Sequence, residues 1–189
     1  SILRSQPPEM AMHRIDSLLA RPAATQDPLL RMGLYNFKGH ALRLLGRLDE
    51  ALASQVRAYE LADSLNDHTG RVEAQIAIAI IHMDRDEVDI ARRQLREVYT
   101  LTEERPIERN YRVPLVLGAI ANKAGQLDSA LFWYGKALPM AEAGHDSSAM
   151  CDIRFNLGIV HGKTLDERAS ERYLLGAMAA IPAKGYPQL

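Results

Sequence analysis

The segment 158–164 is the first candidate for chemistry, because its sequence GIVHGKT approaches that of a phosphate-binding loop. Such a loop needs a glycine, four residues and then Gly-Lys-Ser/Thr, so that backbone N–H groups and the lysine surround the phosphates. Only three residues separate Gly158 from Gly162. The motif must also follow a strand and begin a helix, whereas this segment ends a predicted helix. We therefore expect a turn between two helices here.

The acidic run 84–89 is a second candidate, for calcium. An EF-hand loop that began at Asp84 would need an oxygen ligand at its fifth position, glycine at its sixth and glutamate at its twelfth. The residues at these positions are Val88, Asp89 and Leu95. The run is therefore interpreted as a solvated turn with a helix cap.

The remaining reactive side chains do not form a catalytic arrangement. Cys151 and His161 lie ten residues apart on one predicted helix, which separates them by about 15 Å along its axis and places them on different faces. His82 and His161 occupy the repeat position of Leu42 and Ala121, which is a packing position, so they are interpreted as structural histidines. No histidine pair has metal-ligand spacing on one helical face. The sequence predicts no enzyme activity, no cofactor and no metal site for this segment.

Composition narrows the class of protein. The 189 residues include 26 Ala and 25 Leu but only 11 aromatic residues, a balance that favours closely packed helices. A net charge of −1 argues against nucleic acid as a partner. The single cysteine excludes an internal disulfide, and we find no apolar stretch of membrane-spanning length.

A repeat of about 40 residues organises the chain. Small residues recur at spacings of 40, 39 and 40 in three series: Gly39, Ala79, Gly118 and Gly158; Ala51, Ala91, Ala130 and Ser170; and Ala58, Val98, Ala137 and Ala177. Each copy reads as two helices. In the first copy Asp27-Pro28 begins one helix, Gly46 ends it, Asp49 caps the second and Asn66-Asp67 close it. Small side chains are needed where antiparallel helices cross closely.

Two segments test this interpretation. Residues 74–81 alternate Ile and Ala like a strand, but the register places them in a first helix that is apolar nearly all round. We therefore predict helix there. Pro114 leaves two alternatives, a helix from Pro106 kinked near Asn110 or a shorter helix that starts near Val113. Pro139 is expected to bend the second helix of the third copy.

These features resemble the tetratricopeptide repeat in its longer bacterial form. The first copy matches at Tyr35, Gly39, Leu42, Gly46, Ala51 and Ala58, and the third at Leu117, Gly118, Gly125, Ala130, Tyr134 and Ala137. The resemblance implies an all-α fold, an α-solenoid of antiparallel helix pairs wound into a right-handed superhelix. The expected organisation is 1–27, an N-terminal amphipathic helix and linker from an incomplete repeat; 28–67, 68–106, 107–146 and 147–183, repeats 1 to 4; and 184–189, the start of a truncated further repeat.

In this family the first helices line a concave groove. Residues spaced 3, 4 and 3 along each first helix share that face. The predicted groove residues are Asn36, His40, Arg43, Ile76, Ile80, Met83, Arg112, Leu115, Asn122, Phe155 and Ile159. An apolar groove with a polar rim is typical of sites that receive an amphipathic helix or an extended segment.

The sequence thus predicts a non-enzymatic scaffold that binds protein or peptide, with no nucleic acid and no membrane insertion; a homo-oligomer is compatible with it. The alternative is a sensory or regulatory input region of a larger bacterial signalling protein, such as a diguanylate cyclase, a histidine kinase or a transcription regulator. That alternative rests on a weaker resemblance of the segment 8–20 to such regions. The compartment stays open between cytoplasm and, for a membrane-bound signalling protein, periplasm.

Overall fold

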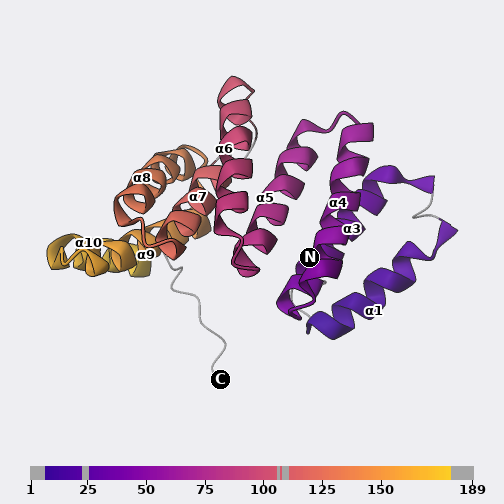
Figure 1. Ribbon diagram of the computed structural model, residues 1–189, viewed down its shortest axis with the longest axis horizontal. Coiled ribbons are helices and arrows are strands. Elements are labelled where there is room, and N and C mark those ends of the chain that lie inside the picture. Colours follow the sequence, from indigo (N-terminus) through magenta and orange to yellow (C-terminus); the bar gives the residue numbers. More distant parts are fainter. Residues whose placement is uncertain (1–6, 23–25, 106, 108–110, 180–189) are drawn as a thin grey trace. The chain divides into compact units, whose positions relative to one another are not determined.

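The computed structural model describes residues 7–22, 26–105, 107 and 111–179. The chain divides into two compact units, Ser1–Val98 and Tyr99–Leu189, and each is described by itself. Every regular element among the described residues is a helix (Figure 1). This confirms the predicted all-α fold. Within the described residues, no helix is both long enough and apolar enough to span a bilayer.

The first unit is built from α1 (Pro8–Leu19), α3 (Pro28–Leu44), α4 (Leu48–Ser64), α5 (His68–Asp84) and most of α6 (Val88–Glu104). Consecutive helices pack on each other, α1 on α3, α3 on α4 and α4 on α5. The core contains Ile15 of α1 against Leu34 of α3, and a cluster around Leu42 that includes Met12, Ala51 and Ile81.

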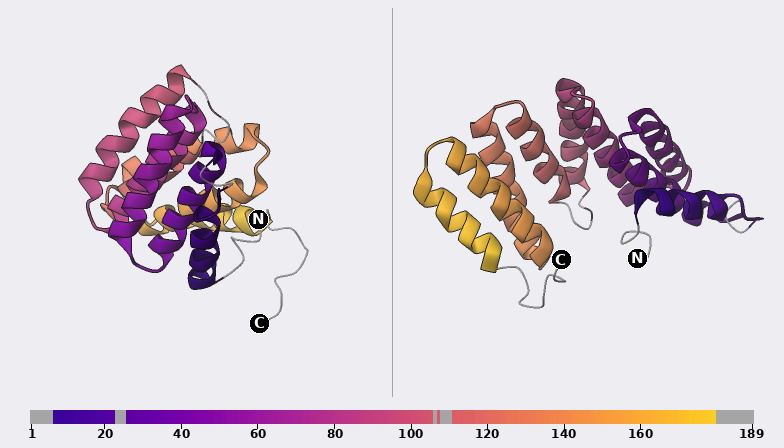
Figure 2. Two further views of the ribbon diagram at one scale, coloured as in Figure 1. Left: turned by 90° about the vertical axis from the view of Figure 1, so that its right-hand side faces the viewer. Right: turned by 90° about the horizontal axis from the view of Figure 1, so that it is seen from below.

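The second unit contains the end of α6, α7 (Arg112–Lys123), α8 (Leu127–Ala143), α9 (Ser147–Lys163) and α10 (Glu167–Ala179). Neighbouring helices again run antiparallel and pack side by side, α7 on α8, α8 on α9 and α9 on α10 (Figure 2). Tyr134 is fully buried in the core of this unit, among Ala137, Ile153 and Leu157.

Aspartate side chains begin several of these helices. Asp27 accepts a hydrogen bond from the backbone N–H of Leu30 at 3.1 Å, as predicted. Asp67 and Asp146 do the same for Gly70 and Ala149, at 2.9 and 3.0 Å. Each of these bonds satisfies an N–H group that has no partner within its own helix.

Of two predictions about the ends of α4, one is wrong and one is confirmed. Asp49 does not cap α4, because this helix already begins at Leu48 and its N-cap, Arg47, makes no side-chain cap bond. An acidic residue in the first turn is favoured by the helix dipole without being the cap. Asn66 and Asp67 close α4 as predicted, because they follow its C-cap, Leu65, and their backbone N–H groups donate to the carbonyls of Asp63 and Ala62 at 3.0 and 2.9 Å. Asn66 adopts a left-handed backbone with φ of 52°, and Asp67 begins the next helix.

The two ambiguous segments are helical. Residues 74–81 lie inside α5 and none of them is exposed, which confirms the prediction of a helix covered nearly all round. Helix α7 begins at Arg112, in agreement with the shorter of the two alternatives. Pro114 therefore lies in the first turn, where its missing N–H would have no intrahelical partner. Residues 106 and 108–110, and with them the expected bend near Asn110, lie outside the described residues. Pro139 does not end α8, which continues to Ala143.

The helices of a pair approach closely at glycines. A Cβ atom added at Gly39 would lie 2.5 Å from Nε2 of Gln55, and one at Gly118 would lie 2.5 Å from Cδ1 of Tyr134. At Gly158 it would lie 2.7 Å from Cγ of Leu174. These separations are too short for any side chain, so the close approach predicted for the three glycines is confirmed.

Replacing Gly118 by leucine should therefore destabilise the fold, because the Tyr134 ring and the backbone of α7 would have to move apart. We expect a loss of at least about 1–3 kcal/mol in the free energy of unfolding, measured by urea denaturation. Gly135→Leu is the control, since a Cβ there has nothing within 4 Å and a leucine favours the helix. Equal stability of the two variants would contradict the packing described here.

The turns that follow the first helices all contain one residue in the left-handed region. These residues are Gly46 (φ 73°), Asp86 (φ 64°), Gly125 (φ 72°) and Leu165 (φ 61°). Glycine adopts this conformation without strain, whereas a leucine Cβ crowds the neighbouring carbonyl oxygen. At Leu165 burial does little to offset this strain, because the side chain is 86% exposed.

Leu165→Gly should consequently stabilise the protein by about 1 kcal/mol, which corresponds to a rise of about 2–4 °C in the melting temperature. The measurement is thermal unfolding followed by circular dichroism. Leu101→Gly provides the comparison, because Leu101 is also exposed but lies inside α6, where glycine costs about 1 kcal/mol. If Leu165→Gly lowers the melting temperature as Leu101→Gly does, the strain assigned to Leu165 does not exist.

Candidate functional site

In the first unit the predicted groove residues lie on α3 and α5. His40 is exposed, and Ile80 and Met83 are half-buried. Asn36 is half-buried, and its backbone carbonyl accepts a hydrogen bond from Nε2 of Gln55 at 3.1 Å. Ile76 is only 1% exposed, so its inclusion among the groove residues is corrected: it lies in the core and cannot contact a partner.

An ion pair joins the two first helices of this unit. Arg43 of α3 donates to Oδ2 of Asp84 on α5 at 2.7 Å. The two side chains are 25% and 31% exposed, so the pair contributes at most about 1 kcal/mol. Its effect is to hold the ends of α3 and α5 at a fixed separation, with His40 one turn away along α3.

In the second unit the predicted residues lie on α7 and α9. Arg112, Leu115 and Asn122 are half-buried on α7, and Ile159 is half-buried on α9. Leu115 packs against the core of the unit. Phe155 differs from these because its side chain is 52% exposed. An exposed phenylalanine on the first-helix face provides apolar area that a partner could cover.

A polar contact again joins the first helices. Nζ of Lys163 on α9 donates to Oδ1 of Asn122 on α7 at 2.8 Å. Asn122 also lies close to the buried hydroxyl of Tyr134, which makes no well-formed hydrogen bond with the described residues. Burial raises the pKa of Tyr134 to about 12, and Asn122 offsets part of this rise. Asn122 thus connects the surface of α7 with the core beneath it.

The segment that approaches a phosphate-binding loop is helical. Residues 158–163 belong to α9 and Thr164 is its C-cap, so their backbone N–H groups do not converge on an anion. The N–H of Thr164 itself bonds to carbonyls of the last turn. This agrees with the prediction that the chain turns between helices at this point.

The two histidines each face an acidic residue across a helix–helix turn. The carboxylate of Glu87 accepts a hydrogen bond from Nδ1 of His82 at 2.5 Å. This bond, with a smaller effect of Arg85, lowers the pKa of Glu87 below its ordinary value. His161 stacks on Tyr173 with ring centroids 5.4 Å apart, and its Nδ1 lies 3.5 Å from Asp166. Both histidines therefore act in packing at turns.

The other candidates for chemistry, Cys151 and the acidic run 84–89, make structural contacts. Cys151 donates a hydrogen bond from Sγ to the carbonyl of Ala177 at 3.3 Å. Within the described residues no three His, Cys, Asp or Glu side chains lie close enough to bind a metal ion. In the acidic run, Asp84 pairs with Arg43 and Glu87 with His82.

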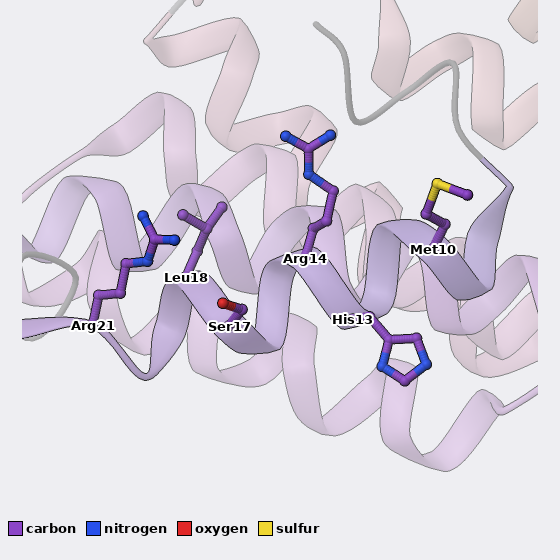
Figure 3. Close-up of a pocket in the computed structure, with 6 residues that line it drawn as sticks. All are labelled: Met10, His13, Arg14, Ser17, Leu18 and Arg21. Atoms are coloured by element: carbon purple, nitrogen blue, oxygen red, sulfur yellow. The ribbon is translucent and has the colours of Figure 1, made fainter.

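Two surface features were not predicted. On α8 and the end of α6, Trp133 makes edge contacts with Tyr99 at 5.1 Å and with Phe132 at 5.0 Å, and Phe132 is 56% exposed. On α1, a shallow hollow of about 550 Å³ is lined by Met10, His13, Arg14, Ser17, Leu18 and Arg21 (Figure 3). All six come from one helix and the turn after it, so this is an open helix face. The only sequence signal for the aromatic contacts on α8 was that Phe132 and Trp133 are adjacent in the chain.

Comparison with known proteins identifies the architecture. No family model matches the sequence, and no curated protein matches it. Solved structures do match. One is BtubC from P. vanneervenii, with a TM-score of 0.68 and 19% identity over 96% of this chain and 74% of that chain. Another is the apo form of RapI, with a TM-score of 0.72 and 14% identity over 92% of this chain and 48% of that chain. The TPR-like repeats of a Podosopora anserina kinesin light chain match with a TM-score of 0.65 and 14% identity, over 94% of this chain and 89% of that chain.

These matches extend over nearly the whole sequence, whereas this chain spans about half the length of RapI. Together with the antiparallel helix pairs and the glycines at their crossings, they show that the chain has the fold of the tetratricopeptide-repeat proteins.

Proposed function

We propose that this chain is a non-enzymatic scaffold that binds a protein or peptide through the first-helix face of its second unit. This face is defined by Leu115, Phe155 and Ile159, with Arg112 and Asn122 at its edges. The bound segment is an amphipathic helix or an extended segment that places apolar side chains against Phe155. The observation that carries the proposal is the exposure of Phe155 on a helix of this fold, since such faces of helical repeats serve as binding surfaces.

The chemistry of the face supports an apolar anchor with polar edges. Phe155 leaves about half of its side chain uncovered, and its full burial is worth about 1.5–3 kcal/mol. Leu115 and Ile159 are half-buried beside it in the repeat register. The Asn122–Lys163 contact holds α7 and α9 together at one end, which keeps the surface rigid and lowers the entropic cost of binding.

The face of the first unit, formed by His40, Arg43, Ile80 and Met83, is more polar. Arg43 is already paired with Asp84, and His40 is exposed. With Ile76 in the core, this face lacks an exposed apolar anchor among its predicted members. We therefore propose that it contributes polar contacts, and that the second unit supplies most of the binding energy.

Phe155→Asp should weaken binding of peptides selected on the native chain. The test selects binders from a displayed library of random peptides about 16 residues long and measures their affinities by fluorescence anisotropy. Loss of the anchor should reduce affinity at least about tenfold. The variant should keep its helical circular dichroism, because half of the Phe155 side chain is already in water.

Phe132→Asp is the matched control, since Phe132 is equally exposed but lies on α8, outside the proposed face. It should leave these affinities unchanged. Ile80→Asp examines the first unit in the same assay and should have a smaller effect. If the selected peptides bind Phe155→Asp as tightly as the parent, or lose as much affinity with Phe132→Asp, the proposed face is not the binding site.

A further inference from the structure

Helix α9 carries a line of side chains that is acidic at one end and basic at the other. Asp152, Phe155, Ile159 and Lys163, called here the α9 stripe, follow one another at spacings of 3, 4 and 4 residues. They therefore lie within an arc of about 80° and extend over about 16 Å of the helix. Asp152 and Lys163 are exposed, Phe155 is 52% exposed and Ile159 is half-buried. The stripe thus adds one charge at each end of the apolar surface proposed above as the binding face.

The two charges of the stripe have no ionic partner in the described part of the chain. Asp152 forms no ion pair with any described residue. Lys163 donates to the amide oxygen of Asn122, which is a neutral acceptor. Asp166 is the acidic residue closest to Lys163 in the sequence, but its carboxylate caps α10 and faces His161. Each end of the stripe therefore presents a charge that an opposite charge on a partner can neutralise.

The equivalent helix of the first unit, α5, does not offer these groups. Ile76 occupies the position of Phe155 and Asp84 that of Lys163, since 155 − 76 = 79 and 163 − 84 = 79. Ile76 is only 1% exposed, and Asp84 accepts a hydrogen bond from Arg43 at 2.7 Å. In α5 the apolar residue is thus used in the core and the charge in an internal ion pair. In α9 both remain available to a partner.

We propose that the partner segment is an amphipathic helix that binds antiparallel to α9 and has a defined order of charges. It carries an acidic residue near its N-terminus, then two apolar residues, then a basic residue near its C-terminus, at successive spacings of 4, 4 and 3 residues. The acidic residue pairs with Lys163 and the basic residue with Asp152. The two apolar residues cover Ile159 and Phe155. This inference rests on the proposed binding face and specifies the chemistry of the segment that binds there.

The geometry of the stripe favours a helix over an extended segment. A partner helix rises by the same distance per residue as α9, so four positions at mirrored spacings stay opposite the four residues of the stripe. An extended segment rises about 3.3 Å per residue, and its successive side chains point to opposite sides. The antiparallel direction also places an acidic residue at the start of the partner helix and a basic residue at its end, where the dipole of that helix favours them. The parallel direction would reverse both.

The charges determine the direction of binding more than its strength. Asp152 and Lys163 are exposed, and an ion pair between exposed groups changes a dissociation constant only about two- to fivefold. Burial of Phe155 and Ile159 supplies the larger part of the affinity. The contact with Asn122 holds the ammonium group of Lys163 in place before binding, which lowers the entropic cost of the pair.

The test compares two synthetic peptides about 16 residues long, made of alanine and glutamine with leucine at both apolar positions. The acid-first peptide carries glutamate before the leucines and lysine after them, and the base-first peptide has these two residues exchanged. Affinities are measured by fluorescence anisotropy in about 20 mM and about 500 mM salt. We expect the native chain to bind the acid-first peptide at least about fivefold more tightly at low salt, and the difference to shrink at high salt.

Exchanging the charges of the stripe should reverse this preference. Asp152→Lys/Lys163→Asp leaves the net charge of the chain unchanged, and it should bind the base-first peptide more tightly than the acid-first peptide. Asp128→Lys/Lys136→Asp is the matched control, because it makes the same exchange between exposed residues of α8. It should keep the preference of the native chain for the acid-first peptide.

Several results would overturn the proposal. These are equal affinity of the native chain for both peptides, tighter binding of the base-first peptide, no binding of either, or an unchanged preference in Asp152→Lys/Lys163→Asp. Failure of the binding face itself gives a different result. Peptides selected from the random library that lose affinity with Phe155→Asp would support the face even where the two designed peptides bind alike, and would reject only the order of charges.

Discussion

A close contact between a glycine and a large side chain determines how the helices of a pair lie together. Gly39 faces Gln55, Gly118 faces Tyr134 and Gly158 faces Leu174, each 16 residues further along the chain. The missing Cβ lets the second helix insert a side chain almost to the backbone of the first. This contact sets the distance between paired helices, and therefore which of their outer residues remain exposed.

Much of the fold was predictable from small residues, because glycine and alanine recur at the repeat positions where helices cross closely. The helical state of residues 74–81 followed from this register, against the local preference of isoleucine for strands. Details at helix ends were less predictable. Aspartate is favoured both as a helix cap and in the first helical turn. The sequence alone therefore does not show which of the two positions Asp49 occupies. The left-handed Leu165 had no local signal, because leucine is disfavoured there.

The candidate face was predictable in part. Helical geometry gives the direction of each side chain on its own helix, and it correctly placed Phe155 at the surface. It does not show how deeply a neighbouring helix covers that direction, and for this reason Ile76 was assigned to the groove although it is buried.

The turns show a period longer than one helix pair. The turns after α3 and α7 contain Gly46 and Gly125 in the left-handed region. The turns after α5 and α9 instead bring His82 to Glu87 and His161 to Asp166. The links Arg43–Asp84 and Asn122–Lys163 recur at an interval of 122 − 43 = 79 residues. Alternate helix pairs of the chain are thus closed by different chemistry, a glycine in the left-handed region in one pair and a histidine–carboxylate contact in the next.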